Sequence, residues 1–170
     1  MIKLLRYLIG GGITIDLRRF FERKLKMATK PIPRGIRNNN CGNIRYDPQV
    51  HWQGQCEEQT DGVFIQFKTP EYGIRAMAKL LRNYQILYNL ESVQEIIGRW
   101  APPNENDTVA YVKAVVDSMK VLPDEPLDLA RPETLCSLIT AIIRQENGEQ
   151  PYTIEIIMRG ISMAKTERKV

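Results

Sequence analysis

The side chain in this sequence best placed to do acid–base chemistry is Glu146, at the end of a helix predicted over residues 132–147. An apolar face repeats along that helix at three- and four-residue steps, and the same steps lead on to position 146. A carboxylate there would be half removed from water and next to the negative end of the helix dipole, and both effects favour a protonated carboxyl. Glu146 is therefore the expected general acid, although helix ends also often carry solvated glutamates. The residues of the apolar face are Leu135, Leu138, Ile139, Ile142 and Ile143.

The composition excludes several other chemistries. The chain has one histidine and three cysteines without a close pair, which argues against a metal centre, a histidine-dependent triad and a disulfide framework. We expect no cofactor and no metal. Catalysis would then come from carboxylates, amides or tyrosines. If a second carboxylate takes part, Asp61 is the first choice and Glu58 the next, with Glu57 the least favoured.

The elements that must position Glu146 belong to a mainly α (α+β) domain of five helices with a small, irregular β-lobe. Val63–Phe67 is predicted as a strand and residues 52–55 as part of a facing strand or turn. Ser92, with Glu95 three residues on, predicts a capping box, and Pro132 and Gly148 bracket the fourth helix. The predicted helices run over about 70–88, 92–100, 107–119, 132–147 and 153–164.

The positive charge lies in an N-terminal extension, residues 1–30, ahead of a domain over residues 31–170. The extension has eight Lys and Arg against two acids, whereas the rest of the chain is slightly acidic, which argues against specific nucleic-acid binding. Its uncharged stretch, Tyr7 to Ile15, is too short to span a membrane, and we recognise no cleavable signal peptide. The extension is either poorly ordered or a contact to a membrane surface or a virion.

Two motifs resemble enzymes that degrade the bacterial cell wall. Residues 141–152, AIIRQENGEQPY, resemble the end of the catalytic helix of lytic transglycosylases and related lysozymes, in which an acid precedes a small polar residue, a glycine and a proline. Residues 39–44, followed by Trp52-Gln53-Gly54 and residues 64–67, are similar in order to flagellar-type and autolysin-type N-acetylglucosaminidases.

The opening of the domain resembles a group of phage and prophage proteins often described as virion structural proteins. Residues 35–46, GIRNNNCGNIRY, repeat the start of that group, with Cys41 where a proline usually stands. The likeness continues through residues 73–76 and 99–106 and covers roughly residues 34–161. These resemblances imply a lysozyme-like domain whose partner is the glycan strand of peptidoglycan.

The chain departs from the glucosaminidases in the position of its acid. Those enzymes have the catalytic acid on a helix before the Asn-rich loop, whereas here only Asp16 and Glu22 precede that loop. The order reads as a circular permutation, which is tolerated when the chain termini lie close together. The hypothesis makes one geometric claim: Glu146 should face the Asn39–Ile44 loop across a cleft.

The resemblance also assigns binding residues around that cleft. Asn39, Asn40 and Asn43 would bond sugar hydroxyls and N-acetyl groups, or alternatively form a self-bonded turn. Gly42 would let the backbone approach the sugar, and Tyr152 would position the sugar or stabilise developing charge. The two tryptophans, Trp52 and Trp100, either stack on sugars or lie in the core.

The function that follows is a virion-associated or prophage-encoded peptidoglycan hydrolase acting on the β-1,4 glycan backbone, either in the virion or delivered to the periplasm and cell wall. The alternative is a non-enzymatic virion protein that keeps the fold for binding peptidoglycan, since a fold alone does not establish an activity.

Overall fold

In a computed structural model of the chain, the described residues are 6–9, 13–16, 19, 31–104 and 107–165. The chain divides into two compact units, Met1–Ile32 and Pro33–Val170, which are described separately. Most of the predicted basic extension, and Glu105 and Asn106 of the second motif, lie outside the described residues.

The first unit contains a β-hairpin. β1 (Arg6–Ile9) pairs antiparallel with β2 (Ile13–Asp16), in a register that places Arg6 opposite Asp16 and Ile9 opposite Ile13. Strands were not predicted there, either for a poorly ordered extension or for a contact to a membrane surface or a virion. No helix among the described residues is long and apolar enough to cross a membrane.

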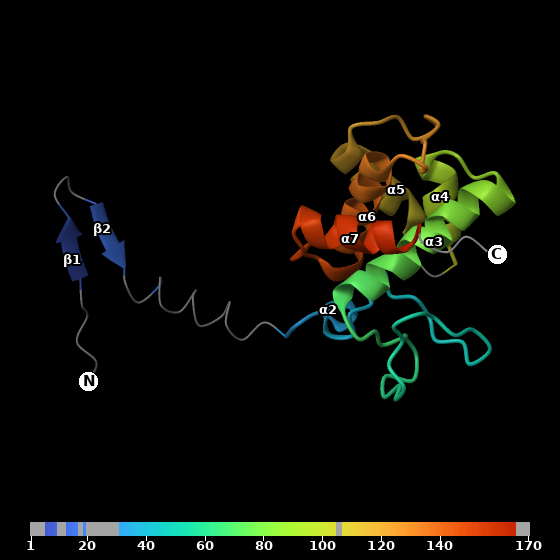
Figure 1. Cartoon of the computed structure of the whole chain (residues 1–170). Helices are drawn as coiled ribbons and strands as arrows, with labels where there is room; N and C mark the ends of the chain where they lie inside the picture. Colours follow the sequence, from blue (N-terminus) through green and yellow to red (C-terminus); the bar gives the residue numbers. More distant parts are fainter. Residues whose placement is uncertain (1–5, 10–12, 17–18, 20–30, 105–106, 166–170) are drawn as a thin grey trace. The chain divides into compact units, whose positions relative to one another are not determined.

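The second unit is mainly α-helical, as expected (Figure 1). The five predicted helices form within about one residue of their expected bounds, and a short helix that was not predicted precedes them. The described helices are α2 (Arg34–Arg37), α3 (Pro70–Tyr88), α4 (Val93–Trp100), α5 (Thr108–Met119), α6 (Pro132–Asn147) and α7 (Ile154–Met163).

Local signals explain where these helices begin and end. Ser92 and Glu95 form the predicted capping box, which satisfies backbone donors at the start of α4. The Asp107 side chain caps α5 by accepting from the Ala110 N–H at 3.0 Å. Gly148 ends α6 with a φ of 68°, in the left-handed conformation that glycine adopts without strain.

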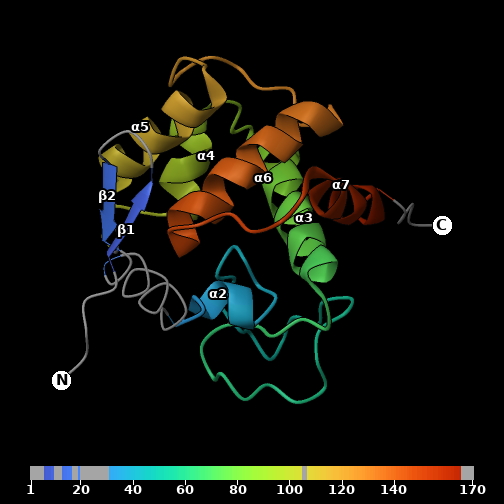
Figure 2. The same ribbon diagram turned by 90° about the vertical axis from the view of Figure 1, so that its left-hand side faces the viewer.

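Helix α6 lies at the centre of the helical body, by which we mean residues 70–165. It contacts α2, α3, α5 and α7, and Figure 2 shows it crossing between α5 on one side and α3 and α7 on the other. Its apolar face is fully buried at Leu135, Leu138, Ile139, Ile142 and Ile143, as predicted. Burial of this face fixes the rotation of α6, and therefore the direction in which its last turn points.

Residues 33–69, which we call the lobe, form one compact region beside α3 and the end of α6 (Figures 1 and 2). The predicted strand Val63–Phe67 does not form as a regular strand, because the lobe has only single bridges, Arg45 with Phe64 and Gln55 with Phe67. The second bridge confirms that residues 52–55 face this segment, as predicted. Backbone and side-chain partners share the hydrogen bonds of this segment. The Ile65 N–H donates to the Ile44 carbonyl at 3.0 Å, and the Cys56 N–H donates to the Gln66 carbonyl at 2.9 Å. The Gln66 N–H donates to Gln59 Oε1 at 2.7 Å, and Asn40 Nδ2 donates to the Ile65 carbonyl at 2.8 Å.

Candidate functional site

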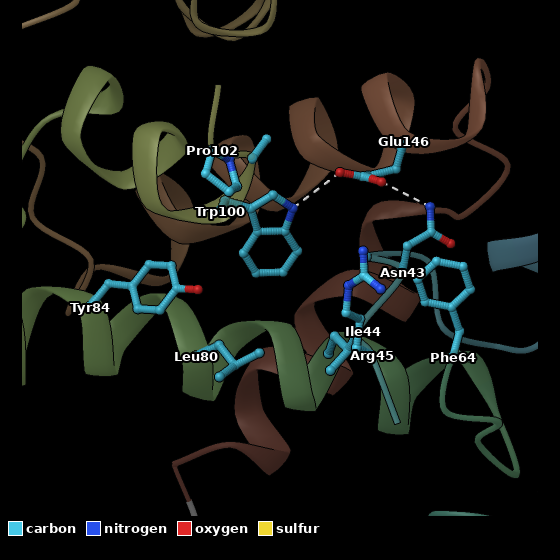
Figure 3. Close-up of a pocket in the computed structure, with 11 residues that line it drawn as sticks. Asn43, Ile44, Arg45, Phe64, Leu80, Tyr84, Trp100, Pro102 and Glu146 are labelled. Carbon is cyan, nitrogen blue, oxygen red and sulfur yellow. Dashed lines mark hydrogen bonds between the residues drawn. The ribbon is translucent and has the colours of Figure 1, made fainter. Parts of the chain in front are cut away.

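A cleft of about 420 Å³ opens between the lobe and the helical body, with Glu146 in its wall (Figure 3). The lobe contributes one side, and the ends of α4 and α6 and the middle of α3 contribute the other. Glu146 is the only acid among the described residues that line it. The lining consists of Gly42, Asn43, Ile44, Arg45, Phe64, Leu80, Tyr84, Trp100, Ala101, Pro102 and Glu146.

Three donors from three separate segments hold the Glu146 carboxylate. Asn43 Nδ2 of the lobe donates to Oε2 at 2.8 Å. Trp100 Nε1, at the end of α4, donates to Oε1 at 3.1 Å, and the Tyr111 hydroxyl, in the first turn of α5, donates to Oε1 at 2.9 Å. Figure 3 shows the first two bonds on opposite sides of the carboxylate. Glu146 therefore lies on the same side of the molecule as the Asn-rich loop, as the permutation hypothesis expects, but it contacts the loop directly through Asn43 and is not separated from it by the cleft.

Apolar helix faces place two of these donors. Trp100 follows Ile96 and Ile97 by four and three residues, so it continues their buried face at the last turn of α4. Tyr111 precedes Val115 by four residues on the buried face of α5. Glu146 ends the face of α6 in the same way. Packing these faces together brings the two aromatic donors to the acid.

The two carboxylate oxygens have different environments. A carboxylate oxygen offers two lone pairs, and Oε1 already accepts two hydrogen bonds, from Trp100 and Tyr111. Oε2 accepts one, from Asn43, and keeps a second lone pair. A proton on this carboxyl would therefore be carried on Oε2.

The environment of Tyr111 keeps it a donor. Burial, and then the negative charge and hydrogen bond of Glu146, raise the pKa of the Tyr111 phenol far above its ordinary value. The hydroxyl therefore stays protonated and donates its hydrogen to Glu146. Because the Tyr111 side chain is only 5% exposed, the donor side of this bond is shielded from water.

Gly35 on α2 makes room for the amide that reaches Glu146. A Cβ built on Gly35 would lie 2.5 Å from Asn147 Oδ1 and 2.8 Å from Asn43 Oδ1, closer than side chains tolerate. Asn147 in turn donates to the Cys41 and Ile143 carbonyls at 2.8 and 2.9 Å, which ties α6 to the lobe. The glycine thus allows two amides to pack against the α2 backbone and fixes Asn43 beside the acid.

Comparison with known proteins places the chain in a phage protein family. No protein-family model matches it. Over 129 residues it is 43% identical to Protein P5 of Pseudoalteromonas phage PM2. The matched residues cover 75% of this chain and 79% of that protein. The chain belongs to the P5 family.

The predicted binding residues of this P5-family chain do not all lie in the cleft. Asn43 and Gly42 line the cleft, whereas Asn40 is buried and bonds the Ile44 and Ile65 carbonyls. Asn39 has a φ of 51° and donates to the Phe67 carbonyl at 2.9 Å. The local Asn40–Ile44 bonds match the alternative of a self-bonded turn, whereas Asn39 bonds a distant segment of the lobe, an arrangement that neither alternative predicted. A Cβ on Gly42 would meet Met77 and Trp100, so the close approach it allows is to the protein itself.

The predicted second carboxylates lie away from the cleft lining. Arg34 donates through Nε to Asp61 Oδ2 at 2.7 Å, and Asn38 Nδ2 donates to the same oxygen at 2.8 Å. The bond from Arg34 is the largest of the causes that hold the pKa of Asp61 well below its usual range. Asp61 is therefore an anchor of the lobe, and its selection as a catalytic carboxylate was wrong. Glu58 and Glu57 are exposed and do not line the cleft.

Tyr152 also lies outside the cleft lining. Its side chain packs against the core, its hydroxyl is buried without a hydrogen-bond partner, and burial raises its pKa above the ordinary value. The prediction that it positions a sugar has no support in this arrangement. Trp52 packs in the small core of the lobe with Ile65 and Phe67, as the core reading predicted.

Trp100, Tyr111 and Tyr84 are the residues that the sequence analysis did not assign to the site. Trp100 was seen but left between core and cleft, and it belongs to both. Tyr84 meets Trp100 edge to face, with ring centroids 6.4 Å apart. Their signal was a polar aromatic at the end of an apolar helix face, the same signal that identified Glu146. No group of acidic, histidine or cysteine side chains within the described ranges could hold a metal ion.

Proposed function

We propose that this chain is a virion-associated phage protein that cleaves the β-1,4 glycan backbone of peptidoglycan, with Glu146 as the general acid. One observation carries the proposal: Glu146 stands in the wall of a cleft, oriented by three donors from three segments, with one lone pair of Oε2 still open. A preoriented acid beside an open site is what proton transfer to a glycosidic oxygen requires.

The lining of the cleft favours a lytic, single-acid route over hydrolysis by two carboxylates. Retaining and inverting hydrolases place a second carboxyl about 5 Å or about 6.5–9.5 Å from the first. Among the described lining residues there is no second acid, and Asp61 is engaged by Arg34 and Asn38. The resemblance of the α6 end to lytic transglycosylases agrees with this route.

In that reaction Glu146 gives its Oε2 proton to the glycosidic oxygen, and the bond from that oxygen to C1 of the muramyl sugar breaks. The 6-hydroxyl of the same sugar then attacks C1 and returns its proton to Glu146, which closes a 1,6-anhydro ring. No water is consumed and the acid is regenerated. The indole and phenol bonds to Oε1 would hold the carboxylate in place throughout both proton transfers.

The decisive variant is Glu146→Gln, which keeps the size of the side chain and removes its acid. We expect its clearing of a cell-wall suspension to fall by at least about a hundredfold, the usual contribution of a general acid. Mass spectrometry of the fragments released by the unmodified protein should show muramyl ends lighter by one water than hydrolysis gives.

Glu149→Gln is the matched control, because Glu149 is an exposed acid of the same motif that does not line the cleft. It should clear cell walls at the rate of the unmodified protein. Undiminished clearing by Glu146→Gln would remove the acid assignment, and fragments with reducing ends would replace the lytic route with hydrolysis.

A second candidate is a virion protein that binds peptidoglycan without cutting it. It is favoured by the fact that Glu146 also joins the lobe to α4 and α5, as a purely structural carboxylate would. Under this candidate the unmodified protein would sediment with cell walls but release no fragments. In both cases the N-terminal extension, residues 1–30, would serve for attachment to the virion or to a membrane surface.

A further inference from the structure

Three aromatic side chains, Trp100, Tyr84 and Tyr88, form a row that leads out of the cleft along α3. Trp100, which donates to Glu146, meets Tyr84 edge to face with ring centroids 6.4 Å apart. Tyr84 meets Tyr88, one helical turn further along α3, in the same way at 6.4 Å. Figure 3 shows Tyr84 at the end of the cleft opposite Phe64. This aromatic row therefore begins beside the acid and continues past the cleft lining, which includes Tyr84 but not Tyr88.

An arginine at the end of α4 holds the outer part of the aromatic row. The Arg99 guanidinium carbon lies 3.8 Å from the ring centroid of Tyr88 and 5.1 Å from that of Tyr84. Tyr88 is 51% exposed, and an exposed side chain without such a contact changes rotamer freely. A ring that is fixed before its ligand arrives loses less conformational entropy on binding. The contact with Arg99 therefore prepares an exposed ring for binding.

The position of the aromatic row favours a glycan strand as its ligand. The cleft extends from Phe64 of the lobe to Tyr84 on α3, with Glu146 in its wall between them. A strand whose glycosidic oxygen lies at Glu146 has sugars on both sides of that oxygen. Those on the α3 side come next to Tyr84 and then to Tyr88. A tyrosine combines an apolar ring with a polar hydroxyl, which suits sugars, whose apolar ring faces lie between hydroxyl groups.

We propose, on the basis of the function proposed above, that the aromatic row binds further sugars of the glycan strand beyond the cleft. Tyr88 would contact these sugars, and Arg99 would be a positioning residue for the Tyr88 ring. The affinity of the protein for a strand would then rise with the number of sugars on the α3 side of the scissile bond. Bonds close to that end of a strand would be cut more slowly than bonds further inside it.

The test measures the binding of peptide-free glycan strands of two, four and eight sugars to the Glu146→Gln protein, which cannot cut them, by calorimetry. We expect the affinity to rise with strand length. Adding Tyr88→Ala should lower the affinity for the longest strand by about tenfold, as the loss of an aromatic anchor does, and so remove most of the rise. Tyr88→Phe keeps the ring and should keep the rise, whereas Arg99→Gln should lose part of it.

Ile86→Ala is the matched control for Tyr88→Ala. Ile86 is a 74% exposed apolar residue two positions before Tyr88, and therefore on another side of α3, away from the aromatic row. Its replacement should leave the rise with strand length unchanged. Equal affinity for the three strands, a rise that survives Tyr88→Ala, or an equal loss at every length would overturn the role of the row alone. Failure of every strand to bind would overturn the proposed function together with it.

Discussion

Different interactions stabilise the helical body and the lobe, each within itself. The body buries long apolar faces, such as that of α6. Its backbone N–H and C=O groups mostly bond one another within the helices. In the described lobe the buried apolar group is small, built on Ile65 and Phe67, and amide side chains bond the backbone at Asn39, Asn40 and Gln66. The body can therefore exchange apolar residues at a graded cost, whereas the lobe depends on particular amides and glycines.

This difference explains how the site is divided between the two regions. The body supplies the acid and its two aromatic donors from rigid helix ends. The lobe supplies Asn43, whose φ of 49° and amide contacts hold it beside the acid. Changes in the body should act on stability first, and changes in the lobe should act on the geometry of the cleft first.

The largest expected effect on stability is in the body. Leu138→Ala would leave a cavity at a fully buried position of α6 and should lower the free energy of unfolding by about 2–5 kcal/mol. Urea unfolding measures this, with Val109→Ala, at an 82% exposed position, as a control that should change little. The activity of the folded fraction should persist. An unchanged midpoint for Leu138→Ala would mean that α6 is not part of the cooperative core.

Gly35→Ala should have a smaller effect on stability and a larger one on the site. Its Cβ would collide with the Asn147 and Asn43 amides, which should lower the free energy of unfolding by about 1–3 kcal/mol and displace Asn43 from Glu146. Cell-wall clearing per folded molecule should therefore fall.

Gly98→Ala provides the contrast for Gly35→Ala. Gly98 lies within α4 with no atom near its missing Cβ, so alanine should stabilise the protein by about 0.5–1 kcal/mol. The free energy of unfolding should rise in Gly98→Ala and fall in Gly35→Ala, and cell-wall clearing per folded molecule should fall only in Gly35→Ala. If Gly35→Ala clears walls as well as Gly98→Ala does, the lobe does not position the site.

The smallest expected effect is the loss of stability at low pH that comes from the Arg34–Asp61 ion pair. Because the folded pKa of Asp61 is depressed, its contribution to stability is present above its unfolded value of about 4 and is lost as the pH falls toward the folded value. Asp61→Asn should remove this pH dependence and cost about 1 kcal/mol or less at neutral pH, since Arg34 is half exposed.

Unfolding measured between pH 2 and pH 7 tests the Asp61 prediction. Asp117→Asn is the control, because Asp117 pairs with Lys113 on an exposed face and should change stability by less than about 0.5 kcal/mol. Equal acid dependence in the two variants would mean that Asp61 does not anchor the lobe.

The sequence was sufficient for the body because its signals are local. The spacing of apolar residues and the capping residues lie within or next to each helix. Ser92 and Asp107 cap the starts of α4 and α5, and Gly148 ends α6, as expected. The rotation of α6 followed from its apolar face, which placed Glu146 at the end of a buried stripe. Its position beside the loop was inferred from the resemblance to the glucosaminidases and not from the helix itself.

The lobe and the donors could not be predicted in the same way, because their partners are far apart in the sequence. Arg34 reaches Asp61 across 27 positions, so the ion pair had no local pattern and Asp61 looked like an available acid. Trp100 and Tyr111 meet Glu146 across 46 and 35 positions. Asn39 and Asn40 shared the composition of Asn43, but only the fold separates the amides that bond the backbone from the one that reaches the cleft.

The 103 positions between Asn43 and Glu146 have a consequence for synthesis of the chain. A ribosome makes the lobe, α3, α4 and α5 before it reaches the acid at the end of α6. Until then the donors Asn43, Trp100 and Tyr111 have no fixed positions, because the helix at the centre of the helical body is still missing. The cleft can form only after α6 has been made, so a translation product interrupted before residue 146 would lack the carboxylate on which the proposed reaction depends.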